Sequence, residues 1–290
     1  MTQSDVRTDF QSPTIHAKFS TLACGSLALL LLAIGGFISP GSSGRVGYVV
    51  QTVGGVLLAV ALIVHIRYLA GRNRSNRIGN PAVVSGILAA VAYPCVFIPY
   101  AVDPALISEP GWANWANSWW GASFLLAAVS LGLTALAKEA ELLAAGARAY
   151  PPCQIGCGCA PIIHASFLSL GTAALGSLLQ AISFFGLIGG GGLNARLIFI
   201  LGTVGPILIA LGIVAHIAHL SARLGRAAVV LGIAGAAMVG VCNIPGISDP
   251  AGAGELGTEL MWILWAAGMF LGGLSLALVA IRKRSQPQSD

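Results

Sequence analysis

Three cysteines lie close together near the middle of the chain, in a stretch rich in proline and glycine. Cys153, Cys157 and Cys159 are separated by three residues and by one, and His164 follows them. Three thiolates and one imidazole form a tetrahedral ligand set for zinc, and three thiolates can also hold an iron–sulfur cluster with one open position. The spacing is not the paired C-x-x-C pattern, so the plainer interpretation is a linker with incidental cysteines and no cofactor.

Four histidines occupy matching positions in the two halves of the chain. His16 and His164 precede the first apolar run of each half, and His65 and His216 lie near the end of the second run. A helical hairpin brings the start of its first helix and the end of its second helix to the same side. We therefore expect His16 to approach His65. His164 is expected to approach His216 in the same way.

Neutral imidazole offers several kinds of chemistry at such positions. It can bind haem iron or zinc, hydrogen-bond a quinone carbonyl or carry a proton. The plainer alternative is that these histidines hydrogen-bond backbone or lipid phosphate and otherwise serve only in packing. The sequence leaves both interpretations open.

The elements that must position these residues are membrane-spanning helices. The chain has 290 residues, of which 56% are hydrophobic and only 9% are charged. A chain of this size cannot hide so much apolar surface from water, so lipid must be its solvent. A soluble protein and a nucleic-acid-binding protein are both disfavoured, although the net charge is +5.

Eight apolar runs are long enough to cross about 30 Å of hydrocarbon at 1.5 Å per residue. The first is longer than the apolar region of a signal peptide, follows Asp5 and Asp9, and precedes no small-residue cleavage site, so we expect it to be retained. The runs cover residues 19–38, 48–70, 82–102, 118–137, 162–188, 197–218, 227–247 and 260–281.

Positive charge is concentrated in alternate loops. Of the 15 Lys and Arg residues, all except Arg45 and Arg196 fall on one side of the predicted membrane. Because cytoplasmic loops carry the excess of Lys and Arg, both termini are predicted to be cytoplasmic in a cell (inner or plasma) membrane. The cysteine linker then lies in a reducing compartment, where a metal or redox site is more typical than a disulfide. Six tryptophans are predicted at the outer interface: Trp112, Trp115, Trp119, Trp120, Trp262 and Trp265.

An internal repeat divides the eight runs into two sets of four. The sequence Ile15 to Phe19 returns as Ile163 to Phe167, and Asp103-Pro104 returns as Asp249-Pro250. The spacing is about 143 to 151 residues, and each unit has an even number of spans, so both units share one orientation. We predict an all-α membrane protein of eight transmembrane helices, arranged as two tandem parallel four-helix repeats with a pseudo-two-fold axis along the membrane normal.

The predicted organisation has five parts. They are a cytoplasmic N-terminal tail (1–18), a first repeat (19–145), a cytoplasmic Cys/Pro/Gly linker (146–161), a second repeat (162–281) and a cytoplasmic basic tail (282–290).

The apolar runs contain no Asp or Glu well inside them, which disfavours a transporter driven by a carboxylate relay. The first hypothesis is a permease-like or lipid- and amphiphile-handling protein with a path between the two repeats. The second is a haem-, quinone- or metal-binding membrane redox protein. The third is a structural or assembly subunit of a membrane complex. Expected partners are membrane lipids, with a membrane protein or a second copy of the chain as alternatives, and no nucleic acid.

Overall fold

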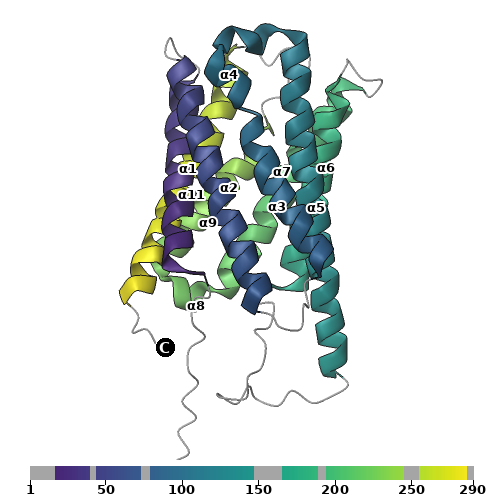
Figure 1. The fold of residues 1–290 in the computed structure, drawn as a ribbon, viewed down its shortest axis with the longest axis vertical. Coiled ribbons are helices and arrows are strands. Elements are labelled where there is room, and N and C mark those ends of the chain that lie inside the picture. Colours follow the sequence, from purple (N-terminus) through teal and green to yellow (C-terminus); the bar gives the residue numbers. More distant parts are fainter. Residues whose placement is uncertain are drawn as a thin grey trace, which may run out of the picture.

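The computed structural model describes residues 17–39, 44–72, 79–146, 165–188, 194–244 and 255–285, which form helices and no strand. Figure 1 shows long helices running side by side along the longest axis of the molecule. The first helices are α1 (Phe19–Ile38), α2 (Gly44–Arg72), α3 (Asn80–Cys95), α4 (Ile98–Val102), the short 3₁₀ helix η1 (Pro104–Ser108) and α5 (Pro110–Gly146). The later helices are α6 (Phe167–Gly186), α7 (Ala195–His219), α8 (Ser221–Leu224), α9 (Arg226–Val241) and α11 (Glu255–Ser285).

These helices have the length and surface that a bilayer requires. Large apolar side chains remain exposed along the outside of the long helices. The eighth predicted span, 227–247, contains the shorter helix α9 of 16 residues and runs beyond the last described residue of that segment. Seven described segments are long and apolar enough to span a membrane: Phe19–Ile38, Gly44–Ala70, Asn80–Val102, Pro110–Ala140, Phe167–Gly186, Arg196–His219 and Glu259–Ser285. The protein is therefore a multi-pass membrane protein whose described part is all-helical.

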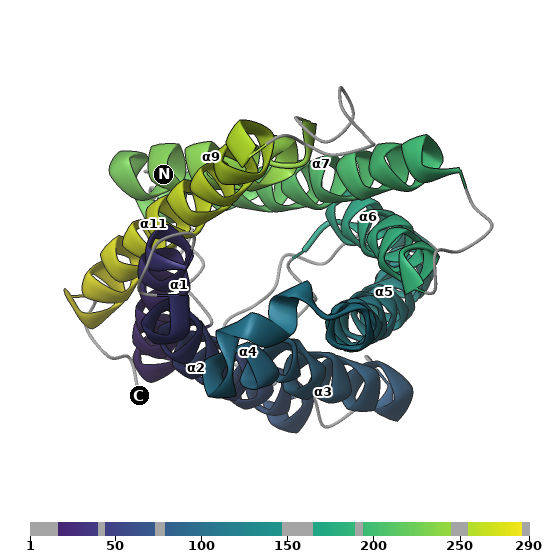
Figure 2. The same cartoon turned by 90° about the horizontal axis from the view of Figure 1, so that it is seen from above.

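The long helices form a closed ring in chain order. Seen from above in Figure 2, each helix packs on the one before it and the one after it, and α11 closes the ring against α1. The start of α1 and the end of α11 lie at the same end of the ring, where the Arg284 guanidinium lies 6.0 Å from the centre of the Phe19 ring. The order around the ring is α1, α2, α3, α5, α6, α7, α9 and α11.

Glycine makes the closest helix contacts in this ring. A Cβ atom added at Gly54 of α2 would lie 2.9 Å from the Leu32 backbone nitrogen of α1. A Cβ at Gly205 of α7 would lie 2.8 Å from the Gly176 carbonyl oxygen of α6. Only glycine allows such an approach, and close backbone packing holds helices together in lipid, where no hydrophobic drive acts between them.

Several serines link neighbouring helices by hydrogen bonds, among them Ser130 and Ser275. The Ser130 hydroxyl of α5 donates to the Ala82 carbonyl of α3 at 2.7 Å. The Ser275 hydroxyl of α11 donates to the Ala228 carbonyl of α9, also at 2.7 Å. Both bonds therefore tie the last long helix of a half to the helix before it.

Prolines divide the third predicted span. The run 82–102 is one predicted helix with kinks, whereas the structure has two helices, with α3 ending at Cys95 and α4 beginning at Ile98. Pro99 has no N–H, so it cannot donate to the Cys95 carbonyl four residues earlier. The Trp115 Nε1–H of α5 donates to the Cys95 carbonyl instead, at 3.3 Å, so this carbonyl still has a hydrogen-bond donor where the helix is broken.

Helix α5 is longer than the predicted span 118–137, because it runs from Pro110 to Gly146. Its additional C-terminal turns contain alanine, leucine, lysine and glutamate, which favour helix in water as well as in lipid. Hydropathy detects only the part of a helix that lies in hydrocarbon, so the prediction of this helix was too short at both ends.

Candidate functional site

Two histidines lie at the same depth on helices that are not neighbours in the ring. His65 follows Gly44, the first residue of α2, by the same number of residues as His216 follows Ala195 in α7. Helix α2 packs on α1 and α3, whereas α7 packs on α6 and α9. An interaction between these two imidazoles must therefore cross the interior of the ring.

The two imidazoles lie within electrostatic reach of each other. The Nδ1 atom of each ring is buried and has no hydrogen-bond partner in the part of the chain that the structure describes. Leaving a buried polar atom unpaired costs about 1–3 kcal/mol, and native structures contain few such atoms. Two of them in one place mark this part of the interior as a candidate binding site.

Accessible apolar side chains lie next to the histidines. On α2, Val60 and Val64 are exposed on the lipid-facing side, and Leu62 between them is also 42% exposed. Residues two apart on an α-helix point about 200° away from each other, so Leu62 faces the interior of the ring. Ile213 has the same relation to the exposed Leu211 of α7 and is 43% exposed. The interior thus retains accessible apolar surface less than one turn before each histidine.

Two lysines face the interior nearer to the end at which α1 begins. Leu136 of α5 and Ile281 of α11 are exposed on the lipid-facing side. Lys138 and Lys283 follow these residues by two positions, so the same helix geometry turns them toward the inside. Lys138 is only 8% exposed. This end of the interior therefore carries positive charge from two helices.

Aromatic rings pack together toward the opposite end. Trp120 and Phe124 of α5 stack with Phe184 of α6, with ring centres 5.4 to 5.9 Å apart and planes within 15° of parallel. Tyr93 of α3 meets Trp120 edge-on at 5.1 Å. Helices α3 and α6 flank α5 on either side. The exposed Leu125 lies on the outer face of α5, so the aromatic side chains meet on its inner face, toward the centre of the helix ring. The histidine end of the interior is accessible, whereas this end is filled by side chains.

The described residues supply two imidazole ligands here and no larger set. His219 lies one turn after His216 and also interacts with it electrostatically, but its side chain is exposed. Within the described ranges, no three His, Cys, Asp or Glu side chains gather closely enough to hold a metal ion. A bare zinc ion, which takes three or four protein ligands, does not fit the pair.

Several predicted site residues lie outside the described ranges. The pairings of His16 with His65 and of His164 with His216 are therefore untested, and so is the Cys3His set. These residues are His16, His164, Cys153, Cys157 and Cys159. Sequence reasoning missed the relation between His65 and His216. Their matching positions indicate a common depth, but only closure of the ring brings them within electrostatic reach of each other.

Comparisons with known proteins give no lead to the function. No protein-family model matches the chain, and no curated protein or solved structure is similar to it. The function must therefore be inferred from the ring and from the side chains that face its interior.

Proposed function

We propose that this protein binds a haem-type cofactor inside the ring, between His65 and His216, and serves in one-electron transfer within the membrane. The observation that carries this proposal is that His65 and His216 each bury an Nδ1 atom without a hydrogen-bond partner among the described residues and lie within electrostatic reach of each other. Each comes from a different half of the chain, so a single ligand between them would join the two halves.

The number of ligands favours haem over a bare metal ion. A porphyrin brings four nitrogen donors of its own, so the protein needs to supply only the axial ligands. Two imidazoles at one depth match that requirement, whereas zinc needs one or two further ligands. The prediction of a zinc or iron–sulfur site at Cys153, Cys157, Cys159 and His164 is separate and remains a prediction.

The surroundings of the two histidines support the same ligand class. Leu62 and Ile213 offer apolar surface for a flat macrocycle, as cofactor sites usually do. Lys138 and Lys283 place positive charge between the histidines and the basic end of the ring, which suits a ligand bearing carboxylates.

The ring is proposed to consist of two tandem four-helix repeats, 19–145 and 162–281, related by a pseudo-two-fold axis along the membrane normal. The bond from Ser130 to Ala82 has a counterpart, with the same length, in the bond from Ser275 to Ala228. The helices that make the two bonds occupy equivalent places in the chain order.

A second pair of contacts also supports the repeat, although the helix that carries the glycine and the helix that carries the proline are exchanged between the two halves. A Cβ at Gly55 of α2 would lie 3.2 Å from the Pro94 side chain of α3. A Cβ at Gly240 of α9 would lie 2.9 Å from the Ala210 side chain and 3.5 Å from the Pro206 carbonyl of α7. Each half thus brings one glycine near one proline at this crossing, although the glycine and the proline stand on opposite helices in the two halves.

We also propose that the protein resides in a cell (inner or plasma) membrane with both termini in the cytoplasm. Arg45 and Arg196 begin α2 and α7 at one end of the ring, whereas most other described Lys and Arg residues lie at the end where α1 begins. Cytoplasmic loops carry this excess, so the basic end is proposed to face the cytoplasm.

A permease-like or amphiphile-handling protein is the second candidate. The accessible Leu62 and Ile213 favour it, because an acyl chain could occupy the same apolar interior. The aromatic packing around Trp120 argues against a path open to both sides in this state. The assembly-subunit hypothesis, with a membrane partner or a second copy, remains a prediction.

Absorption spectroscopy separates the first two candidates. The full chain is produced with added haem precursor, purified in mild detergent and assayed for haem per chain, in the oxidised and the reduced state. We expect about one haem per chain from a bis-imidazole site. His65→Ala and His216→Ala should each lose it, and His219→Ala is the matched control that should retain it. Haem-free protein of native fold would reject the proposal in favour of the second candidate. Haem retained when both His65 and His216 are replaced would reject these two residues as its ligands.

A further inference from the structure

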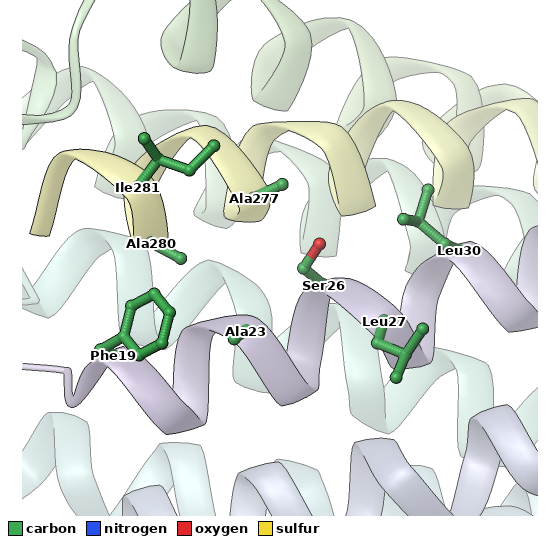
Figure 3. Close-up of a pocket in the computed structure, with 8 residues that line it drawn as sticks. All are labelled: Phe19, Ala23, Ser26, Leu27, Leu30, Ala277, Ala280 and Ile281. Carbon is green, nitrogen blue, oxygen red and sulfur yellow. The ribbon is translucent and has the colours of Figure 1, made fainter. Parts of the chain in front are cut away.

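We propose that the contact line between α1 and α11 binds one acyl chain of an anionic phospholipid in the leaflet at the basic end of the ring. A groove of about 300 Å³ follows this line on the outside of the molecule (Figure 3). Its walls include Phe19, Leu27 and Leu30 of α1 with Ala277, Ala280 and Ile281 of α11. This site is independent of the haem proposal, because it lies outside the ring.

The chemistry of the groove calls for an apolar occupant. The one polar side chain in its wall is Ser26, which is buried and donates its hydroxyl hydrogen bond to the Gly273 carbonyl of α11 at 2.8 Å. That hydroxyl is therefore already engaged within the protein. Leu27 and Ile281 remain exposed at 51% and 64%, so apolar surface is offered to whatever fills the groove.

The dimensions of the groove match one leaflet. Phe19 and Leu30 are separated by 11 residues of helix, which corresponds to a length of roughly 16 Å. The hydrocarbon core of a bilayer is about 30 Å thick, so the groove extends over about half of it. A single acyl chain anchored at the interface would fill this length.

Positive charge lies at the interfacial end of the groove. The Arg284 guanidinium is 6.0 Å from the centre of the Phe19 ring, and its side chain is exposed. Lys18, which directly precedes Phe19, is also exposed, but its Nζ lies over Tyr68 of α2, 5.0 Å from the ring centre, so Arg284 is the basic residue at the groove itself. Guanidinium binds phosphate oxygens in pairs, and its positive charge attracts a phospholipid of net negative charge more strongly than a zwitterionic one.

The opposite contact line of the ring, between α5 and α6, provides an internal comparison. Phe167 begins α6 and is 42% exposed, as Phe19 is, and Leu136 of α5 is exposed like Ile281. The charges differ, however, because Glu139 and Ser166 occupy the positions that correspond to Arg284 and Lys18. This second line has apolar surface without the basic residues, so it should not select anionic lipid.

Native mass spectrometry of the full chain tests the proposal. The probes are phosphatidylglycerol and phosphatidylcholine with identical acyl chains, added to protein in neutral detergent. We expect preferential retention of phosphatidylglycerol. Arg284→Gln should reduce that preference about fivefold, the effect of one basic residue at an anionic surface. Ile281→Trp, which fills the groove, should lower retention of both lipids, and Leu136→Trp is the matched control that should leave retention unchanged.

Three outcomes would overturn the proposal. One is equal retention of the two lipids by the unaltered chain. Another is an unchanged preference in Arg284→Gln. The third is co-purification of a protein partner that is lost in Ile281→Trp, which would assign the groove to another membrane helix. Ile281 and Arg284 are both exposed, so neither substitution should prevent folding.

Discussion

Gly79 has backbone angles that only glycine adopts at low cost. Its φ of +79° is combined with a ψ of +143°, and it caps the start of α3. A side chain in this region costs about 1–3 kcal/mol. We therefore expect Gly79→Ala to lower the free energy of unfolding by this amount, measured by thermal or denaturant unfolding in detergent.

The matched control for this change is Gly132→Ala in α5. A Cβ atom there meets nothing within 4 Å, and the position is helical, so alanine should be neutral or stabilise by up to about 1 kcal/mol. Equal destabilisation by Gly79→Ala and Gly132→Ala would contradict the backbone explanation.

The sequence identifies candidate residues by type, but it does not reveal which way their side chains point. His65 and His216 stand out as histidines near the ends of apolar runs. Their facing arrangement depends on helix rotation and on closure of the ring, which hydropathy does not encode. Lys138 is similar, because its sequence position suggests an exposed topology signal, whereas its side chain is buried.

At the scale of helices, two of the interhelical serine bonds, those of Ser130 and Ser275, provide a test of the proposed repeat. Ser130→Ala and Ser275→Ala each remove one hydrogen bond between adjacent helices. Such bonds average about 0.6 kcal/mol in membrane proteins, with a maximum near 1.7 kcal/mol. We expect the two variants to lose similar stability, and chemical unfolding in mixed micelles measures it. If the two losses of stability differ by more than about 1.7 kcal/mol, the two serines do not have equivalent structural roles.

The bond to the broken turn of the third span gives a second prediction at this scale. Trp115→Phe keeps an aromatic ring but removes the N–H that donates to the Cys95 carbonyl. We expect a loss of about 0.5–1.5 kcal/mol in unfolding free energy. Trp119→Phe is a suitable control, because its ring packs on Trp115. If the two variants lose equal stability, the specific bond to Cys95 contributes nothing.

Helices were predictable from the sequence to the extent that lipid determines them. The long apolar runs correspond to helices in the structure, because hydrocarbon offers no hydrogen-bond partner and the backbone N–H and C=O groups must pair with each other. The ends were not predictable in the same way. Helix α5 extends past the apolar run through helix-favouring polar residues, and the third span breaks where Pro99 removes a donor.

At the scale of the whole molecule, the closed ring and its charge asymmetry predict an orientation. A green fluorescent protein fused after the last residue should fluoresce, because the C-terminus is proposed to be cytoplasmic. Alkaline phosphatase fused after Ser108, between α4 and α5, should be active, since that connection lies at the opposite end. Active phosphatase at the C-terminus would reverse the proposed orientation.

The ring also explains why the binding site was only partly predictable. A linear sequence with an internal repeat suggests two equal halves, and within-half pairing of His65 with His16 is the natural expectation. The contacts of α5 with α6 and of α11 with α1 join the halves into one ring. The interior is then lined by both halves, and His65 of α2 and His216 of α7 lie within electrostatic reach of each other across it.

Electron paramagnetic resonance of the oxidised protein tests the central claim most directly. The chain has five histidines, so labelling with ¹⁵N-histidine marks every imidazole and no other side chain. We expect a low-spin iron signal with hyperfine coupling to two imidazole nitrogens in the unaltered chain, and no such signal in His65→Ala or His216→Ala, because each of these variants should lose the haem. Coupling to one imidazole or to none, in protein that contains haem, would contradict a cofactor shared between α2 and α7.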